Sequence, residues 1–406
     1  MEKKSKKKLF VILLDAFSSN YINHKLTPFL YGLTKNSKYI KKLIPSIGFC
    51  ERAELFSGLS SFDNGYLTAI NFSTKSPYRS IKILLSLLNF FSLSNYKFID
   101  KILRRLLWIY SKIINQPMHP QNIPLNLLGN VSLTEDLEDI YKKNALGVES
   151  IFDIARKNNI HIDTSSFTSL RSKISGTDIS RINNLINSLE NKEDIYFLYI
   201  SELDYIGHKY GPNSINAYES AIKIDTSLEK VINNIKKIKS KSEFIIIGDH
   251  GMDKVKHHLN VLDIINKITK KNKLKLKKDY LFFLDSTILR IFFKNNNTQV
   301  IFENELKKNK LLLNNGQFFE KKIQATYNIT NKCNYGDLIW WANSGTVINP
   351  SFYSKKNFIE KGMHGYINNK TFGFAIILNN YLKNKIIDED KLCSLTKYIK
   401  DFIKYN

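Results

Sequence analysis

The sequence contains no stretch of about 18 consecutive apolar residues, the length that a membrane-crossing helix needs, so no membrane span is predicted. It has only three cysteines among its 406 residues, Cys50, Cys333 and Cys393, and they form no disulfide framework of the kind found in small secreted proteins. We detect no internal repeat and no RNA- or DNA-binding motif. These absences argue against a helical membrane protein, a disulfide scaffold and a repeat array.

The N-terminal stretch MEKKSKKKLFVILLDAF has part of a secretory signal pattern, a basic tip followed by an apolar run. That run, 9–14, is only six residues long, and it ends at Asp15 without a small-residue cleavage site behind it. We therefore expect a basic tip that leads into a first buried strand. The expected location is the cytoplasm, where the reducing conditions also suit the few cysteines.

Acidic residues are scarce relative to basic ones, 37 against 61, which gives the chain a net charge of +24. Much of the excess is lysine in a sequence also rich in asparagine and isoleucine, a mixture that genome composition alone can produce. The functional readings are attraction to a phosphate-bearing substrate, to an anionic membrane surface or to nucleic acid. Nucleic acid is the least favoured because no matching motif is present.

Apolar runs typical of buried strands alternate with segments of helical periodicity. The predicted strands are 8–14, 40–44, 196–200 and 244–247, and the predicted helices are 27–34, 51–59 and 217–238. This alternation predicts an α/β fold with a mostly parallel central sheet flanked by helices. We expect the core of that fold to comprise residues 1–74, 146–267 and 336–406.

Two regions read as additions to the core. Residues 75–145 are expected to form a helical cap insertion that selects the substrate, and 268–335 a small α+β subdomain. The cap contains 96–115, YKFIDKILRRLLWIYSKIIN, in which apolar residues recur at helical spacing among five basic ones. This helix either packs on the core or lies on a membrane surface, which would make the protein peripheral to a membrane.

Several potential metal ligands follow the predicted strands. Asp15 and Asp249 lie directly after strand runs, and Asp204 lies shortly after another. Asp204 and His208 are four residues apart, so a helix would place both on one face. Because ligands in such folds bind at the carboxyl ends of the strands, these positions suit a site for zinc or a similar ion. An ordinary surface Asp–His pair is the alternative.

The order of motifs resembles the alkaline phosphatase superfamily, in particular its type I phosphodiesterase / nucleotide pyrophosphatase branch. The motifs are Asp15, PSIGFCERAELFSGL (45–59), ELDYIGHKYGP (202–212), GDHGM (248–252) and GMHGY (362–366). The resemblance implies an alkaline phosphatase-like core with two divalent metal ions, zinc by default and manganese as the alternative. It implies one site formed by Asp15, Asp249 and His250, and another formed by Asp204, His208 and His364.

The same resemblance implies a metal-dependent hydrolase or transferase that cleaves phosphodiester or pyrophosphate bonds by a two-metal mechanism. The expected substrate is a nucleotide-type or other small phosphodiester. One alternative is a sulfatase or phosphomonoesterase, which uses the same ligands. The other is a catalytically altered metal-bearing binding protein at a membrane surface.

The chain departs from the family pattern at the nucleophile, where Gly48 stands in place of Ser or Thr. Cys50 is the candidate nucleophile in the same loop, because a thiolate near cations is reactive. The alternatives are a buried, inert Cys50, direct attack by hydroxide, or a protein that binds phosphate esters without cutting them. Arg52 is the candidate for binding a substrate oxyanion, and Glu51 needs a proton, a metal ion or Arg52 to neutralise it near phosphate.

Overall fold

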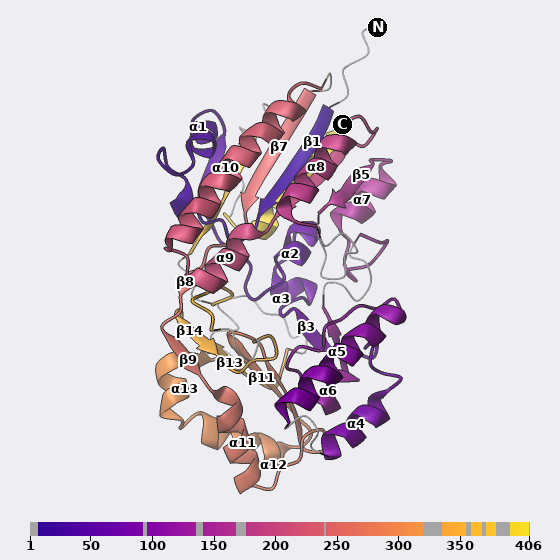
Figure 1. Ribbon diagram of the computed structural model, residues 1–406, viewed down its shortest axis with the longest axis vertical. Coiled ribbons are helices and arrows are strands. Elements are labelled where there is room, and N and C mark those ends of the chain that lie inside the picture. Colours follow the sequence, from indigo (N-terminus) through magenta and orange to yellow (C-terminus); the bar gives the residue numbers. More distant parts are fainter. Residues whose placement is uncertain are drawn as a thin grey trace. The chain divides into compact units, whose positions relative to one another are not determined.

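The computed structural model describes residues 7–91, 96–134, 141–167, 176–238, 241–319, 335–354, 359–367, 371–378 and 390–405 (Figure 1). Cys333 lies outside these residues. The chain forms two compact units. The first comprises Met1–Asn64, Ile140–Val255 and Glu360–Asn406, and the second comprises Gly65–Asp139 and Lys256–Ile359.

The first unit is organised around a six-stranded sheet with β1 near its centre. The strand order is β2 (Lys38–Leu43), β16 (Gly373–Leu378), β7 (Lys241–Gly248), β1 (Lys7–Leu14), β6 (Ile195–Ile200) and β5 (Ile162–Ser166). β1 pairs in parallel with β6 and β7, β5 pairs in parallel with β6, and β16 runs antiparallel to both of its neighbours. The predicted α/β class with a mostly parallel central sheet is confirmed.

The helices of the first unit follow the predicted alternation. They are α1 (Pro28–Lys35), α2 (Glu51–Ser57), α3 (Ser61–Asn64), α7 (Ile151–Lys157), α8 (Asp178–Ser188), α9 (Glu202–Tyr210), α10 (Ile215–Ile235) and α15 (Thr396–Tyr405), with short 3-10 turns η1 (Ser19–Tyr21) and η3 (Leu392–Leu395). The predicted helices 27–34, 51–59 and 217–238 correspond to α1, α2 and α10. A two-stranded pair, β8 (Asp253–Lys254) and β15 (Gly362–Met363), joins the segments that follow β7 and precede β16.

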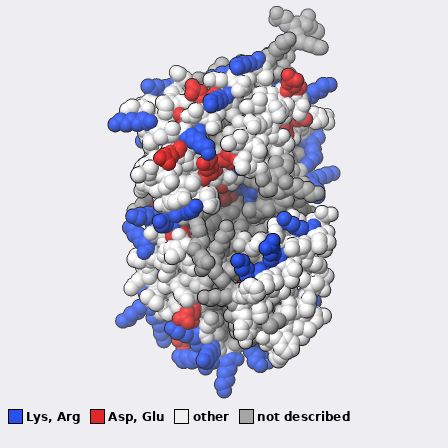
Figure 2. Space-filling view, in the orientation of Figure 1, with Lys and Arg blue, Asp and Glu red and all other residues white. Residues whose placement is uncertain are grey.

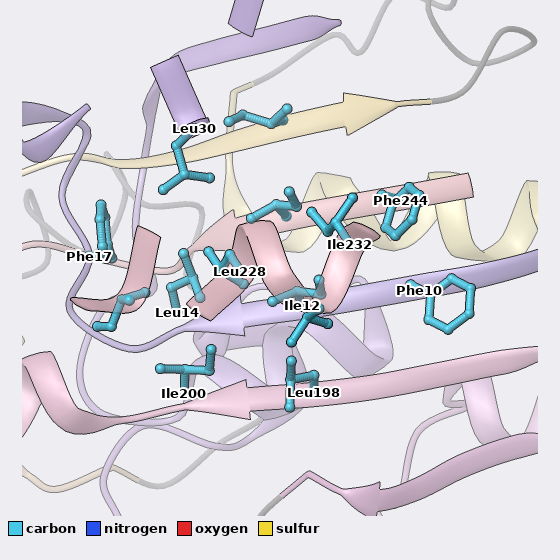
Figure 3. Close-up of a cluster of buried hydrophobic side chains, with 14 of the residues drawn as sticks. Phe10, Ile12, Leu14, Phe17, Leu30, Leu198, Ile200, Leu228, Ile232 and Phe244 are labelled. Atoms are coloured by element: carbon cyan, nitrogen blue, oxygen red, sulfur yellow. The ribbon is translucent and has the colours of Figure 1, made fainter. Parts of the chain in front are cut away.

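The hydrophobic core of the first unit lies where α10 covers the sheet. Apolar residues recur along α10 at spacings of three and four, which places them on one face, and Leu228 and Ile232 are fully buried there. Figure 3 shows these two side chains near Ile12 of β1, in a cluster that also contains Phe10 of β1 and Leu198 of β6. The central strands are buried on both sides because other helices cover the opposite face.

The second unit contains a four-stranded antiparallel sheet and several helices. The sheet order is β10 (Tyr280–Leu284), β11 (Ile288–Phe293), β13 (Leu338–Ala342) and β12 (Gly316–Phe318). Two further strand pairs are β3 (Ile70–Phe72) with β4 (Val131–Leu133), and β9 (His257–Leu259) with β14 (Thr346–Ile348). The helices are α4 (Lys82–Phe90), α5 (Lys97–Ile113), α6 (Leu125–Leu128), α11 (Val261–Lys271), α12 (Asn296–Leu306) and α13 (Lys310–Asn315).

The second unit contains residues 75–139 of the predicted cap insertion and all of the predicted small subdomain, 268–335. It also contains 65–74, 256–267 and 336–359, which the sequence pattern had grouped with the core. Among the described residues, no helix combines the length and the apolar character needed to cross a membrane.

Candidate metal centre

Three strands of the sheet end at the same level, and two of them are followed directly by acidic residues at this edge. Leu14, the last residue of β1, is paired in register with Ile200 of β6 on one side and with Gly248 of β7 on the other. Asp15 and Asp249 are therefore the first residues beyond two adjacent strands. Strands in parallel register make this edge the place where functional side chains of an α/β fold gather.

The first half of the site consists of Asp15, Asp249 and His250. The Nε2 atom of His250 lies 3.2 Å from Oδ1 of Asp15 and 3.8 Å from Oδ1 of Asp249. The backbone N–H groups of Ala16 and His250 donate hydrogen bonds to Oδ1 of Asp249, at 3.1 and 2.8 Å. These bonds fix the Asp249 carboxylate at the strand end, and both Asp249 and His250 are buried.

The second half of the site is built on α9 and the segment around His364. Asp204 and His208 lie one turn apart on α9, as predicted, with Nε2 of His208 3.3 Å from Oδ1 of Asp204. Nε2 of His364 lies 3.8 Å from the same oxygen. The carbonyl of Gly362 lies 2.9 Å from Nδ1 of His208, which leaves Nε2 of that ring facing Asp204.

Glycine at position 362 allows the His364 segment to reach α9. A Cβ atom on Gly362 would lie 2.5 Å from the carbonyl oxygen of Gly207, closer than real carbon atoms approach backbone. The absence of a side chain therefore brings the two backbones together. His364 reaches the site from a segment about 150 residues away in sequence from α9 because of this close approach.

The two halves meet through their imidazole rings. The rings of His250 and His364 are stacked, with centroids 3.9 Å apart and 8° between their planes, and the rings of His208 and His364 are 5.4 Å apart. The six side chains named from the sequence thus converge at one edge of the sheet. Potential ligand atoms lie within 4.8 Å of one another in three groups: Asp204, His208 and His364; Asp15, Asp204 and His250; and Glu51, His250 and His364.

The charges in this cluster are strongly coupled. Burial raises the pKa of Asp249 to about 7, against the opposing effect of His250. Burial disfavours a protonated His208, but the adjacent Asp204 outweighs it and raises the pKa of His208 above its ordinary value. Burial and the charge of His250 hold the pKa of His364 well below its ordinary value. Protons on imidazoles thus neutralise the clustered carboxylates in part.

The donor set fits divalent metal ions. Asp204 Oδ1 and His364 Nδ1 are buried, and neither makes a well-aligned hydrogen bond among the described residues, although Asp204 Oδ1 faces His208 at 3.3 Å. Carboxylate oxygens and imidazole nitrogens together are ligands for zinc, and manganese also accepts them. A divalent cation would neutralise the carboxylates and satisfy these two atoms.

The loop that carries the candidate nucleophile lies against this centre. The Phe49 and His364 rings form a T-shaped contact with centroids 5.2 Å apart, and Glu51 Oε1 lies 3.9 Å from His364 Nδ1. Cys50 is fully buried immediately before α2. It belongs to none of the three ligand groups found among the described residues. Arg52 is close enough to lower the pKa of the Tyr199 hydroxyl through its charge.

Gly48, at the family's nucleophile position, has a φ angle of 93°. This value lies in a region that residues with a side chain rarely adopt. The loop conformation therefore requires glycine at position 48, and this glycine also leaves the loop without the hydroxyl group of the family's nucleophile. Ser46, two residues earlier, is buried and bonded to Ser61 Oγ at 3.0 Å, in a network with the carboxylate of Glu54.

Tyr199 is a member of the site that sequence reasoning missed. Its hydroxyl donates a hydrogen bond to Oδ2 of Asp15. Burial and the charge of Asp15 raise the pKa of Tyr199 well above its ordinary value, so the hydroxyl stays protonated as a donor. The available signal was its place as the next-to-last residue of a buried strand, where a polar-tipped side chain reaches the strand end.

Comparisons with known proteins identify the family and the fold. Residues 135–367, more than half of the chain, match the family model described as type I phosphodiesterase / nucleotide pyrophosphatase. The fold is similar to murine ectonucleotide pyrophosphatase / phosphodiesterase 5, solved as an inactive variant in complex with AMP. The TM-score is 0.66 at 14% identity, and the match covers 99% of this chain and 96% of that one.

Two sequence relatives match shorter segments. GPI ethanolamine phosphate transferase 3 of Saccharomyces cerevisiae is 33% identical over 70 residues, which is 17% of this chain and 7% of the transferase. Alkaline phosphatase PhoV of Synechococcus elongatus is 32% identical over 123 residues, 28% of this chain and 21% of the phosphatase. The match over 135–367, in a chain whose fold follows a phosphodiesterase over nearly its whole length, shows that this protein belongs to the type I phosphodiesterase / nucleotide pyrophosphatase family of the alkaline phosphatase superfamily.

Proposed function

We propose that the protein is a metal-dependent hydrolase or transferase that cleaves phosphodiester or pyrophosphate bonds. The observation that carries the proposal is the convergence of three carboxylates and three imidazoles at the end of the central strands. The chain's membership of the type I phosphodiesterase / nucleotide pyrophosphatase family also supports the proposal.

Two divalent ions, zinc or manganese, fit the centre. We assign Asp15, Asp249 and His250 to one ion and Asp204, His208 and His364 to the other. The ions would supply positive charge that polarises a bound phosphate and stabilises the leaving oxygen. The chain's own contribution is to hold these ligands rigidly, through the strand register, α9 and the hydrogen bond from Tyr199 to Asp15.

Glu51 adds a seventh potential ligand. Its carboxylate faces His364 and belongs to a ligand group with His250 and His364. Of the ways in which a carboxylate is tolerated near phosphate, binding to a metal ion is the one that this position favours. Arg52, next in sequence, is proposed to bind a phosphate oxygen, because a guanidinium pairs well with oxyanions.

The attacking group is either Cys50 or a water molecule. Cys50 is on the same loop as Glu51 and Arg52, but it is fully buried, so we expect the loop to shift before the thiolate attacks. A water molecule needs no such shift.

The proposed substrate is a small phosphodiester or a nucleotide-type pyrophosphate. A protein of the same fold was solved with AMP, and the named activity of the yeast relative is transfer of ethanolamine phosphate. Phosphomonoesters are the second candidate. Of the two sequence relatives described above, the one from Synechococcus elongatus has the longer matched segment, and it is named as an alkaline phosphatase. A phosphomonoester carries more negative charge than a phosphodiester, whereas a phosphodiester has a second ester group that the site must accommodate.

The test combines metal analysis with a substrate panel. Elemental analysis of the purified protein is expected to find zinc or manganese, and a nitrophenyl phosphodiester to be hydrolysed faster than the nitrophenyl monoester. Asp249→Asn should lower the rate by roughly 100-fold or more and reduce the metal content. The exposed Asp263→Asn is the matched control, since the Asp263 carboxylate pairs with Lys267 on the surface of α11.

Two further variants identify the attacking group. Loss of activity in Cys50→Ala that Cys50→Ser restores in part would support Cys50, and full activity in Cys50→Ala would assign the attack to water. Metal-free protein, or a monoester rate far above the diester rate, would contradict the proposed function.

A further inference from the structure

The helices α4 and α5 expose an unusual concentration of large apolar side chains. Among the described residues, twelve exposed large hydrophobic side chains lie between positions 83 and 113. They include Ile83, Leu87 and Phe90 along α4. Ser80, just before α4, shares a 2.7 Å hydrogen bond with Tyr110 of α5, so the two helices lie close together in the second unit (Figure 1). A patch of this size marks an interaction surface.

The α5 helix presents its apolar stripe to solvent. Ile102, Leu106, Ile109 and Ile113 recur at spacings of three and four and are all exposed. The buried residues among the described positions of the same helix are Asp100, Leu107 and Ser111, two of them polar. An ordinary surface helix of a globular protein shows the reverse arrangement, with its apolar stripe inside.

Polar contacts hold α5 in this orientation. Arg104 pairs with the buried Asp100 at 2.9 Å and donates hydrogen bonds to the carbonyls of Gln121 and Ile123, at 2.5 and 3.1 Å. The Ser111 hydroxyl lies 3.2 Å from the backbone N–H of Met118, which donates to it. Rotating the helix to bury its apolar stripe would break the bonds from Arg104 to the carbonyls of Gln121 and Ile123 and the bond between Ser111 and Met118.

The charge around this face has one sign. Between residues 65 and 134 the sequence has eight basic residues and one acidic residue, Asp100, which is buried and paired. Lys82, Lys101, Arg105 and Lys112 are exposed beside the apolar residues. Figure 2 shows the region of α4 and α5 as largely white with some blue side chains. The face therefore combines exposed apolar surface with positive charge.

We propose that the face formed by α4 and α5, here called the α4–α5 face, docks on the surface of an anionic lipid bilayer. Its apolar side chains would enter the boundary between headgroups and acyl chains, while the Lys and Arg side chains contact lipid phosphates. A second copy of the chain is a poorer occupant, because a symmetric contact would bring the same positive charges together. The inference does not depend on the proposed catalytic function.

Vesicle cosedimentation tests this proposal with matched variants. The wild-type protein is expected to bind vesicles of phosphatidylcholine with phosphatidylglycerol, and to bind pure phosphatidylcholine vesicles much more weakly. The double variant Leu106→Ser/Ile113→Ser should lower the partition coefficient by roughly tenfold or more. Its control is Ile179→Ser/Ile215→Ser in the first unit, since exposed fractions of 59% and 75% match the 58% of Leu106 and the 75% of Ile113.

A second pair of variants separates charge from apolar contact. Lys101→Gln/Arg105→Gln should weaken binding to the anionic vesicles several-fold and reduce its sensitivity to salt. The control Lys236→Gln/Lys237→Gln removes two exposed lysines at the end of α10 and should leave binding unchanged.

Trp108 reports on the same face by fluorescence. It lies on α5 with the Lys112 ammonium 4.5 Å from its ring, whereas the only other tryptophans, Trp340 and Trp341, are fully buried. Anionic vesicles should shift the emission of wild-type protein to shorter wavelength, and Trp108→Phe should abolish the shift. Equal binding of wild type and Leu106→Ser/Ile113→Ser, or no vesicle binding at all, would overturn the proposal. A dimer that the same double variant dissociates, without vesicle binding, would assign the face to a second copy instead.

Discussion

The imidazole rings of His250 and His364 stack face to face, with centroids 3.9 Å apart and 8° between their planes. Each ring belongs to a different half of the centre, since His250 contacts Asp15 and His364 lies nearest Asp204. Two stacked imidazoles resist being protonated together, and the charge of His250 indeed lowers the pKa of His364. The stacking therefore couples the two halves electrostatically as well as by contact.

Tyr199 is expected to act by positioning Asp15. Tyr199→Phe removes the hydroxyl that donates to Asp15 Oδ2, so we expect metal affinity to fall by about 10- to 100-fold with little change in fold. Titration of the metal-free protein with zinc, followed by calorimetry, measures this change. Tyr205→Phe on the exposed side of α9 is the control, and equal affinities for the two variants would remove Tyr199 from the site.

Asp178 is expected to hold the start of α9. Its carboxylate accepts hydrogen bonds from the backbone N–H groups of Ser201 and Glu202, at 3.0 and 2.9 Å, and pairs with Arg181. Asp178→Ala should lower the free energy of unfolding by about 1–3 kcal/mol and weaken metal binding, because α9 carries Asp204 and His208. Denaturant unfolding with and without metal checks both effects. A variant with wild-type stability and metal content would contradict the prediction.

Gly48 is expected to be required for the shape of its loop. Gly48→Ala places a side chain at a φ angle of 93° and should lower the free energy of unfolding by about 1–2 kcal/mol. Gly32→Ala in α1 is the opposite control, because a Cβ there meets no atom within 4 Å and alanine favours a helix by up to about 1 kcal/mol. Thermal unfolding of the two variants should shift in opposite directions, and shifts of the same sign would refute this explanation.

Asp285 is expected to give the second unit a pH-dependent stability. Burial raises the pKa of this carboxyl to about 6, against 3.8 as its ordinary value, while the Ser286 N–H bond at 2.7 Å and Arg290 oppose the rise. Between these two pKa values the folded state binds more protons than the unfolded state. The stabilisation of the folded state by the protonated Asp285 is therefore complete at low pH. This stabilisation is lost as the pH rises from about 4 to about 6, and the free energy of unfolding falls by up to about 3 kcal/mol.

The variant Asp285→Asn isolates this effect, because an amide keeps the oxygen that accepts from Ser286 but does not titrate. Its stability relative to wild type should increase as the pH rises from about 4 to about 6 and stay constant above that. Denaturant unfolding at several pH values in the presence of a chelator measures the difference. A difference that does not change with pH would show that Asp285 is ionised in the folded protein across this range.

Much of the first unit could be predicted from local pattern. The runs 8–14, 196–200 and 244–247 lie within β1, β6 and β7, because continuous apolar runs of this length suit strands that are buried on both faces. The spacing of Asp204 and His208 predicted one face of a helix, and α9 provides it. Such patterns involve only a few neighbouring residues, so they can be recognised from the sequence alone.

The role of Tyr199 and the position of Glu51 against His364 were not predictable in this way. Both depend on contacts between segments that are far apart in the chain. Nothing in the run 196–200 distinguishes a tyrosine that packs in a core from one whose hydroxyl reaches a carboxylate at the edge of the sheet. The register of β1 with β6 decides that.

The sequence by itself determined which segments become strands and helices and which ligand types follow the strands, because periodicity and residue chemistry are local properties of the chain. Only the tertiary structure decided that the His250 and His364 rings stack and that the apolar stripe of α5 points outward. The pattern of 96–115 indicated an amphipathic helix, but the Arg104 bonds to distant carbonyls chose which face is buried. The energies of contacts between remote segments depend on the assembled fold. A short window of sequence therefore does not reveal these contacts.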